Sequence, residues 1–322
     1  MERRTETVSS DRIADTNGGF TYRGRVPVAD EGSSLLDHLA RRHAHSTRAD
    51  WSARIAAGAV AIDGEVRPPD ARLRAGQEVS WTRPGWVEPE APLAWALLYR
   101  DADLLAVAKP AGLPTLPGGG YLENTLLARV RRVHPEASPL HRLDRGASGV
   151  VLLARTPAAG AALAEAFRDR RVDKTYRALV EGRPAGDSFA VTTPIGRVGL
   201  AEGRSAWVAA TSNRSAAPVR AARTEVRVLE RRPDGTCLVE AIPITGRPHQ
   251  IRVHLAAAGH PLTGDPFYAA GGGLRPGARN PGAGGYHLHA LRVTLPHPAD
   301  GRAVTIECSP PPQLTPARRP AL

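Results

Sequence analysis

Short apolar segments alternate with polar residues along most of the chain, and their lengths predict strands more often than helices. Two uninterrupted apolar runs, residues 104–108 and 149–154, each end at a cation, as is typical of buried strands. Residues 224–245 contain two alternating segments around a Pro-Asp-Gly turn, a pattern that predicts a β-hairpin. The remaining strands of the C-terminal body are predicted at residues 174–182, 292–298 and 302–308.

Two segments of this body show helical spacing instead. One is residues 157–169, and its apolar stripe consists of Ala162, Leu163, Ala166 and Phe167. The other is predicted to begin at residues 245–248, because proline is favoured in a first helical turn, and to end near Gly259. Its core face consists of Ile251, Leu255 and Ala258. Arg252 lies on a neighbouring stripe, where it can reach the edge of a cleft.

The order of these elements predicts an α+β fold, with an antiparallel sheet of mixed strand order and packed helices. Residues 31–83 form a smaller pattern of two helices and short strands, which predicts a separate small α+β domain. We expect residues 1–30 to be a flexible tail, because they show no sustained periodicity. A Pro-rich and Gly-containing linker is predicted at 84–93, the main domain at 94–310, and a C-terminal tail at 311–322.

The charge of the chain is unevenly divided. Its 322 residues carry 43 Lys and Arg against 32 Asp and Glu, a formal net charge of +11. Residues 1–90 hold 13 arginines and 14 acidic residues, a net of −1, so the remaining 30 cations and 18 anions give residues 91–322 a net of +12. Such an excess favours a polyanionic partner. A coding bias that replaces lysine by arginine also explains the arginines, since only Lys109 and Lys174 are lysines.

Several classes of protein are disfavoured. No segment approaches the roughly 18 apolar residues of a membrane span, and the N-terminus lacks the apolar core of a secretory signal. We therefore expect a cytoplasmic protein that contacts no membrane and acts as a monomer. Cys237 and Cys308 are expected to be free thiols, because no Cys and His spacing suits a zinc site.

One carboxylate stands out. Within LHRLDRGASGVVLLAR (140–155), Asp144 lies between two arginines and just before a turn that leads into a buried strand. The spacing alone leaves two interpretations open, a turn-forming or ion-paired aspartate and a catalytic one. The segment resembles the catalytic loop of RNA pseudouridine synthases of the large-ribosomal-RNA-modifying, RluA-like family, whose pattern is H-R-L-D-x-x-T-S-G.

Four further segments resemble motifs of that family, in the family's order. They are LLAVAKPAGLPT (104–115), FRDRRVDKTYRALVEG (167–182), ITGRPHQIRVHLAAAGHPLTGDPFY (244–268) and YHLHALRVTLPHP (286–298). Both lysines fall inside these motifs. Ala147 replaces the usual threonine and Pro248 a frequent threonine or serine, and neither change removes a group that does chemistry. The hydroxyl lost at Ala147 puts the rigidity of the Asp144 loop in question.

The small N-terminal domain resembles the RNA-binding domain of a small-subunit ribosomal protein, chiefly through residues 53–81. Its RNA-facing helices would carry Arg41, Arg42, His43, His45, Arg48 and Arg54. A structural appendage without RNA contacts is the alternative, because the domain as a whole is not basic.

The resemblance implies that the protein isomerises a uridine already in RNA to pseudouridine, without a cofactor or a metal. Asp144 would be the essential carboxylate, adding to the anomeric carbon, removing the 2′ proton or adding to the pyrimidine ring. Arg252 would keep it ionised, and Tyr176 would stack on the uracil and accept or relay the carbon 5 proton. Arg142 would help to hold the target nucleotide outside its helix. The remaining residues expected to bind RNA are Lys109, Arg145, Lys174, Arg247, His249 and Gln250.

Two rival functions can be weighed. The histidines that cluster in the C-terminal third raise the possibility of a metal-dependent hydrolase, namely His249, His254, His260, His287 and His289. However, His249 and His254 are wrongly spaced for one helix face, and no H-E-x-x-H pattern is present. A non-catalytic RNA-binding or ribosome-assembly protein is the other rival, and the joint presence of Asp144, Tyr176 and Arg252 argues against it. The resemblance points to large-subunit ribosomal RNA as the substrate, and transfer RNA is the alternative.

Overall fold

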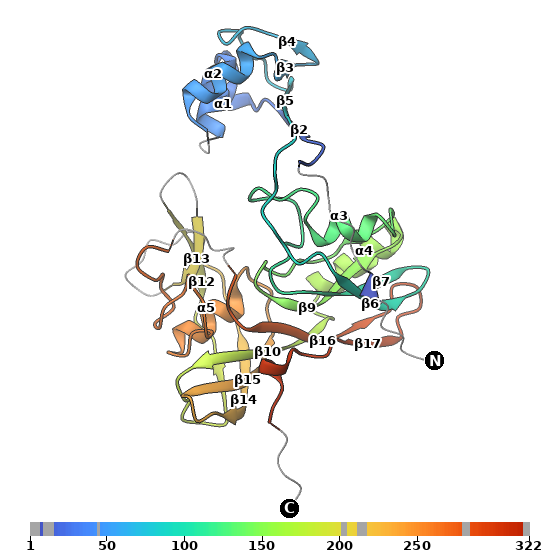
Figure 1. Ribbon diagram of the computed structural model, residues 1–322, viewed down its shortest axis with the longest axis vertical. Helices are drawn as coiled ribbons and strands as arrows, with labels where there is room; N and C mark the ends of the chain where they lie inside the picture. The colour runs from blue at the N-terminus through green and yellow to red at the C-terminus, as the bar shows by residue number, and fades with distance from the viewer. Residues whose placement is uncertain are drawn as a thin grey trace, which may run out of the picture. The chain divides into compact units, whose positions relative to one another are not determined.

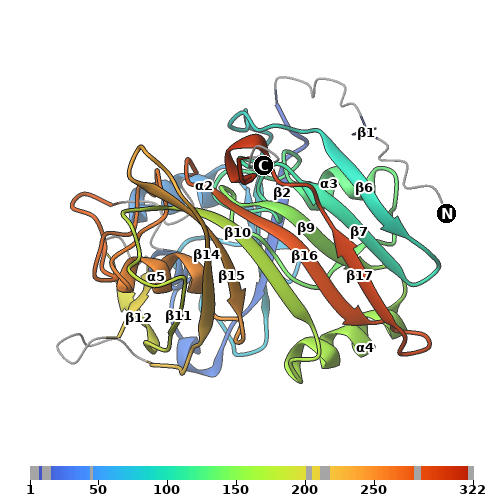
Figure 2. The same cartoon turned by 90° about the horizontal axis from the view of Figure 1, so that it is seen from below.

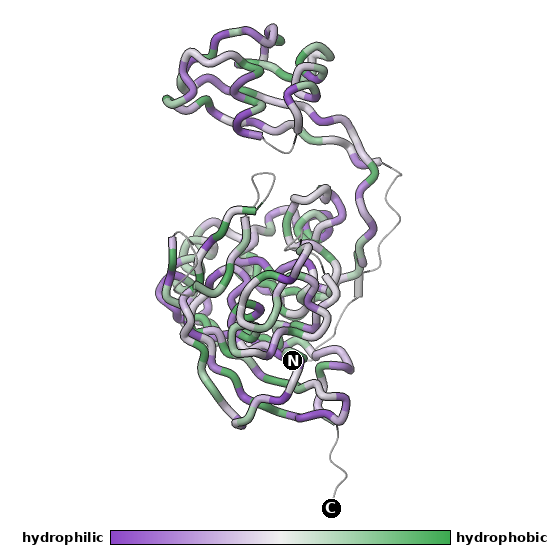
Figure 3. Tube along the Cα trace, turned by 90° about the vertical axis from the view of Figure 1, so that its left-hand side faces the viewer, coloured by the Kyte–Doolittle hydropathy of each residue, from purple (hydrophilic) through white to green (hydrophobic). Residues whose placement is uncertain are grey.

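The computed structural model describes residues 7–8, 16–43, 46–200, 205–210, 218–278 and 284–317. The chain divides into two compact units, whose elements are labelled in Figure 1. The small unit comprises Arg12–Glu88 with Gly199–Ser205, and the large unit comprises Met1–Asp11, Pro89–Val198 and Ala206–Leu322. Figure 3 shows short hydrophobic stretches alternating with hydrophilic ones along the trace of both units.

The large unit is built on one 11-stranded sheet with the order β1-β6-β7-β9-β16-β10-β15-β14-β11, in which β17 also pairs with β16 and β8 with β9. Figure 2 shows its long strands side by side. The strands are β1 (Thr7–Val8), β6 (Trp95–Arg100), β7 (Leu104–Lys109), β8 (Ser138–Pro139), β9 (Ser148–Ala154), β10 (Asp173–Glu181), β11 (Ser188–Val191), β14 (Thr224–Arg231), β15 (Thr236–Pro243), β16 (Leu288–Pro296) and β17 (Ala303–Glu307). Every pair is antiparallel except β9 with β16, which is parallel. A separate pair is formed by β12 (Ile195–Gly199) and β13 (Ser205–Ala209).

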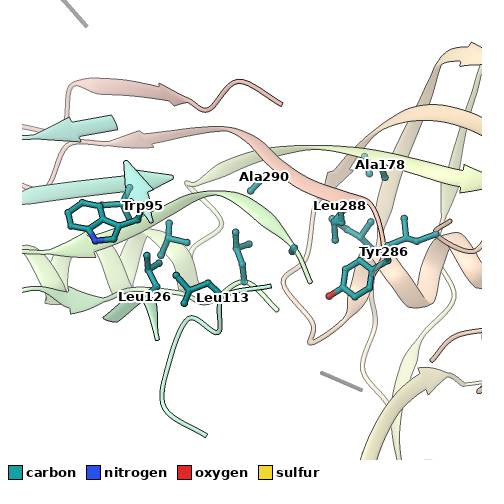
Figure 4. Close-up of a cluster of buried hydrophobic side chains, with 14 of the residues drawn as sticks. Trp95, Leu113, Leu126, Ala178, Tyr286, Leu288 and Ala290 are labelled. Atoms are coloured by element: carbon teal, nitrogen blue, oxygen red, sulfur yellow. The ribbon is translucent and has the colours of Figure 1, made fainter. Parts of the chain in front are cut away.

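Burial on both faces explains the apolar runs of β7 and β9. Leu105 and Val107 belong to one hydrophobic cluster, whereas Leu104 and Ala106 belong to another, and successive residues of β9 divide in the same way. Because side chains alternate between the faces of a sheet, a strand covered on both sides is apolar throughout. Figure 4 shows the first cluster between the sheet and the segment containing Leu113 and Leu126.

Three helices accompany this sheet: α3 (Leu126–Arg131), α4 (Pro157–Arg168) and α5 (Gln250–Ala257). The predicted helix at 157–169 is confirmed as α4, which Thr156 caps by accepting a hydrogen bond from the backbone of Ala159. The predicted start of the other helix at 245–248 is wrong, because α5 begins at Gln250 after a left-handed residue, His249. Helix α3 was not predicted, since six residues are too few to show a helical period.

The small unit is an α+β domain with a four-stranded sheet of order β2-β5-β3-β4 and two helices. Its elements are β2 (Phe20–Arg25), α1 (Leu35–Arg42), α2 (Arg48–Ala56), β3 (Val60–Ile62), β4 (Glu65–Val66) and β5 (Glu78–Arg83). Ser34 caps α1, and Thr47 forms a capping box with Asp50 on α2. Trp51 and Leu35 are almost completely buried in its core.

Two predicted tails need correction. Residues 20–25, expected within a flexible tail at 1–30, form β2 and pair with β5. This strand was missed because it lies at the sheet edge and nearly all of its residues are exposed, which removes the apolar alternation. At the other end, Leu314 of the expected tail 311–322 is buried against Leu179 and Leu238. The predicted linker 84–93 is also ordered in part, since Asn17 bonds to Trp86 and Glu88.

The described residues contain no helix that is long and apolar enough to cross a membrane.

The parallel pairing of β9 with β16 requires a glycine at position 149. A Cβ there would lie 2.2 Å from the carbonyl oxygen of Ala290, and the φ of Gly149 is +112°. We expect Gly149→Ala to lower the free energy of unfolding by about 2–4 kcal/mol, since the clash is with backbone and the conformation is strained for any other residue. Chemical denaturation measures this difference.

Gly160→Ala is the matched control in the same unit. A Cβ at Gly160 would make only an ordinary 3.6 Å contact with Ala154, and alanine is favoured over glycine within a helix. Its stability should be unchanged or slightly higher. Equal stabilities for the two variants would contradict the close approach of β9 and β16.

Candidate active site

Asp144 lines a cavity of about 300 Å³ in the large unit. It is enclosed by the loop before β9, one end of β10, the loop that leads into α5 and the first turn of α5, with single residues from the ends of α4, β15 and β16. The lining residues are His141, Arg142, Leu143, Asp144, Ala147, Phe167, Lys174, Tyr176, Pro243, Thr245, Gly246, Arg247, Pro248, His249, Gln250, Ile251, Arg252 and Leu288. The structure therefore brings Asp144, Tyr176 and Arg252 together, as the sequence predicted.

The carboxylate of Asp144 is held loosely. Its Oδ2 lies 3.3 Å from Nη1 of Arg252 and 3.5 Å from the hydroxyl of Tyr286. Its Oδ1 lies 3.6 Å from Nε2 of His249. The side chain is 26 % exposed, in contrast to the 1 % of Arg252. These long contacts leave lone pairs of the carboxylate accessible from the cavity.

The backbone on either side of Asp144 is held firmly by residues 109–115. Thr115 bonds through its hydroxyl to both the amide and the carbonyl of Leu143. The amide of Gly112 and Nζ of Lys109 both donate to the carbonyl of Arg145, at 2.7 and 3.2 Å. Since the residue before Asp144 and the residue after it are both fixed, the loop holds its position without the threonine usual at 147. Ala147 is instead buried in the hydrophobic core.

The C-terminal part of the same loop is joined to β16. The hydroxyl of Ser148 donates to Nδ1 of His289, because Nε2 of that ring must donate to the carbonyl of Cys308. Gly146 packs against the ring of Tyr286, and a Cβ at this glycine would lie 2.7 Å from a ring carbon. Side-chain contacts therefore hold the motif that contains Asp144 against the motif that begins at Tyr286.

Arg252 is the central cation of the site. Its Nε and Nη2 donate to the two carboxylate oxygens of Asp265 at 2.8 and 2.9 Å, which leaves Nη1 for Asp144. The side chain of Asp265 is completely buried. Burial, the largest single influence, lowers the pKa of Arg252, but the hydrogen bonds to Asp265 together with the charges of nearby acidic groups outweigh it and raise this pKa. The guanidinium is therefore a permanent charge beside Asp144.

Two tyrosines enclose this guanidinium. Its central carbon lies 4.2 Å from the ring centroid of Tyr286 and 4.9 Å from that of Tyr268. Burial and the charge of Asp144 raise the pKa of Tyr286 well above its ordinary value. Its hydroxyl is therefore protonated and donates to Asp144. Together the rings exclude water from the cation, which strengthens its interaction with the carboxylates.

Tyr176 reaches the cavity from β10, where the pairing with β16 is interrupted by a β-bulge between Thr175 and Tyr176. Its neighbours on the adjacent strands are Ala241 and Ala290, whose small side chains leave room for the ring. No described residue bonds to its hydroxyl. Burial and the charge of Asp144 raise the pKa of Tyr176 to about 12. The phenol is thus a hydrogen-bond donor at neutral pH and cannot accept a proton in that state.

The residues predicted to contact RNA fall into two groups. Arg142, Lys174 and Arg247 line the cavity, and among the described residues neither Arg142 nor Lys174 has a hydrogen-bonded or ion-paired partner. Arg145 points elsewhere in the large unit and donates to the hydroxyl of Tyr121 at 2.6 Å. Arg142 and Lys174 are therefore available to a bound anion, whereas Arg247 donates from its Nε to the carbonyl of Ala221.

Two further residues that were predicted to bind RNA, Lys109 and Gln250, have structural roles. Lys109 is 2 % exposed and donates to the carbonyls of Pro110, Leu113 and Arg145. Burial lowers its pKa to about 7, against the opposing charge of Asp144. Gln250 is 4 % exposed and connects the loop before α5 to the backbone of Arg223. Lys109 is therefore an internal support that does not line the cavity, whereas Gln250 lines the cavity and also fixes the loop before α5.

The histidines of the C-terminal third do not assemble a metal site. His254 bonds to Thr224 and to the carbonyl of Thr193, and His260 faces the carbonyl of Glu181. Among the described residues, no group of three or more His, Cys, Asp or Glu side chains is arranged to hold a metal ion. Cys237 and Cys308 are free thiols, as predicted.

Sequence reasoning missed four residues of the site: Thr115, Asp265, Tyr268 and Tyr286. Asp265 gave a usable signal, since it is a carboxylate within the mostly apolar stretch HPLTGDPFY (260–268). The clamping role of Thr115 gave none, because its partner Leu143 lies 28 positions away.

Comparisons with known proteins agree with this geometry. The family model for RNA pseudouridylate synthase matches residues 103–257. A protein of Synechocystis sp. named as an uncharacterised RNA pseudouridine synthase is 37 % identical over 283 residues, which cover 87 % of this chain and 95 % of that protein. The dual-specificity RNA pseudouridine synthase RluA of Escherichia coli is 37 % identical over 228 residues, covering 68 % of this chain and 94 % of RluA.

A solved structure gives the same result. The human protein named RNA pseudouridylate synthase domain containing 1 superposes with a TM-score of 0.55 at 29 % identity, over 70 % of this chain and 87 % of that one. The α+β prediction for the large unit is confirmed by this neighbour and by the observed sheet. The chain therefore belongs to the RluA-like family of RNA pseudouridine synthases, enzymes that isomerise uridine within RNA.

Proposed function

We propose that this enzyme, acting as a monomer, converts uridine to pseudouridine in large-subunit ribosomal RNA with Asp144 as its essential carboxylate. The observation that carries the proposal is the contact of Asp144 with the buried, permanently charged Arg252 inside a cavity.

The isomerisation of uridine requires an ionised carboxylate with an accessible oxygen. The guanidinium of Arg252 favours the charged form of Asp144, and the long contacts leave the oxygens accessible. Such a group can add to the anomeric carbon, remove the 2′ proton or add to the pyrimidine ring. Tyr176, whose phenol is protonated, stacks on the uracil and donates a hydrogen bond.

The cations at the cavity suit an RNA strand. Arg142 and Lys174 have no anionic partner within hydrogen-bonding distance among the described residues, and Arg247 lies in the same lining. They are placed to bind the phosphates that flank an extruded nucleotide, whose contacts offset the cost of unstacking.

Two observations bear on the class of RNA. The small unit resembles a ribosomal-protein domain, which supports ribosomal RNA. Transfer RNA is the second candidate, because a relative is named as a dual-specificity enzyme. Mapping pseudouridines in total RNA from a deletion strain and its parent decides between them.

We further propose that the small unit contributes RNA affinity through β2 rather than through its helices. The helical arginines are largely neutralised, since Arg41 and Arg42 bond to Asp30 and Arg48 bonds to Asp37. His45, which was expected on the same face, lies outside the described residues.

In contrast, β2 carries two exposed aromatic rings, one of which stacks on a tryptophan of the adjacent strand β5. Phe20 and Tyr22 are 46 % and 43 % exposed, and their centroids are 4.9 Å apart. Tyr22 stacks on Trp81, whose ring also lies 4.6 Å from the guanidinium of Arg54. Aromatic rings beside arginine form the surface on which proteins stack unpaired bases.

Asp144→Asn is expected to reduce pseudouridine formation by about a thousandfold or more, because the amide is a poor nucleophile and base. RNA affinity should change little, since the phosphate contacts remain. Product analysis of digested RNA and a binding titration measure the two effects. If Asp144→Asn still modified RNA at an appreciable rate, the assignment of the essential carboxylate would be wrong.

Replacing both Phe20 and Tyr22 by alanine is expected to weaken RNA binding about tenfold or more, since stacking contributes ~1–3 kcal/mol per base. Val66→Ala is the matched control, because Val66 is an exposed apolar residue of the same unit outside this surface. Filter binding with a substrate RNA measures both. If the double variant and the control bound RNA with equal affinity, β2 would not contribute to RNA binding.

A further inference from the structure

His249 occupies an unusual position beside Asp144. It immediately precedes α5 and has a φ of +55°, one of three non-glycine residues with positive φ in the described part of the chain. Its ring lines the cavity, with Nε2 3.6 Å from Oδ1 of Asp144 and Nδ1 2.7 Å from the hydroxyl of Tyr268. A side chain in a strained backbone conformation at such a site suggests a function.

The hydrogen bonds determine which nitrogen of the ring carries the proton. The hydroxyl of Tyr268 lies 2.8 Å from the carbonyl of Trp207, which can only accept, so the single phenolic proton is donated there. The same oxygen must then accept from Nδ1 of His249. In the neutral ring, Nε2 therefore has no proton and presents a lone pair to the cavity beside Asp144.

No other uncharged basic lone pair reaches this cavity from the described residues. His141 has its Nε2 occupied by the amide of Leu152. Tyr176 is protonated, and Lys174 and the arginines are donors. Besides the carboxylate of Asp144, the basic group is therefore Nε2 of His249.

The reaction needs such a group after the new carbon–carbon bond has formed. Carbon 5 then carries both the ribose and a proton, and the ring has a double bond between C6 and N1. We propose that Nε2 of His249 is the general base that removes this proton. The inference rests on the proposed function, in which Asp144 is already assigned to the earlier steps.

The step balances. The C5–H electron pair becomes the C5=C6 double bond, and the C6=N1 pair moves to N1. The proton passes from carbon 5 to Nε2 and then from the imidazolium to N1, so the isomerisation neither gains nor loses a proton. While the imidazolium exists, the adjacent carboxylate of Asp144 stabilises it.

The charged groups near the ring are Asp144 and Asp265, which favour its protonation, and Arg252 and Arg142, which oppose it. Burial, the largest influence, lowers the pKa of His249 below its ordinary value. The ring is therefore neutral, and competent as a base, at pH 7. Activity should fall as the pH decreases through that lowered pKa, where Nε2 becomes protonated.

His249→Asn tests the proposal, since asparagine tolerates the left-handed conformation and preserves the fold. We expect kcat to fall on the order of a hundredfold with KM nearly unchanged, and the limb of the pH profile that His249 produces to disappear. With a transcript containing 5-deuterated uridine, the variant should show a primary isotope effect on kcat, because proton removal has become rate-limiting.

His260→Asn is the matched control and should behave as the wild type, because His260 lies outside the cavity and faces a carbonyl. Tyr268→Phe should show a smaller loss with the same isotope effect, since it removes only the group that fixes the tautomer. A slow His249→Asn variant without an isotope effect would overturn the proposal and leave His249 as a positioning residue. An active Asp144→Asn variant would instead refute the proposed function of Asp144, so the two failures are distinguishable.

Discussion

The buried ion pair between Arg252 and Asp265 is the interaction on which the site depends. Two parallel hydrogen bonds fix the guanidinium plane and direct its remaining nitrogen at Asp144. A buried arginine without such a partner would be strongly unfavourable, and so would a buried aspartate. Because Asp265 compensates the charge of Arg252, the cation can be buried and still act on a third group. The rings of Tyr268 and Tyr286 complete its surroundings.

In the Asp144 loop the backbone is held rigidly, whereas the reactive carboxylate is bonded only weakly. Hydrogen bonds from Lys109, Gly112 and Thr115 fix the backbone on both sides of Asp144, whereas the carboxylate itself makes only contacts of 3.3 Å and longer. A firmly bonded carboxylate would be a poor nucleophile, and a mobile loop would misplace it. The segment 109–115 therefore stabilises the loop without taking part in the chemistry.

The two units differ in whether their cations are paired with acidic side chains. In the small unit, Asp30 and Asp37 pair with helical arginines, and residues 1–90 carry a net charge of −1. In the large unit, Arg142 and Lys174 line the cavity without a close acidic partner among the described residues. The +12 of residues 91–322 is thus concentrated in the unit that holds the reacting group.

The sequence by itself determined the strands that are buried on both faces, helix α4, the small α+β domain and the group of Asp144, Tyr176 and Arg252. The strands, the helix and the small domain have a local cause, namely an apolar run or a helical period, whereas the group of three residues was implied by the resemblance of their separate motifs to the family. Only the tertiary structure decided that Asp265 holds Arg252, that Thr115 holds the Asp144 loop and that Lys109 and Gln250 are internal supports. The edge strand β2 was missed for the same reason. A hydrogen bond between distant residues and a strand defined by its partner leave no period in the sequence, because their energy comes from contacts that exist only after folding.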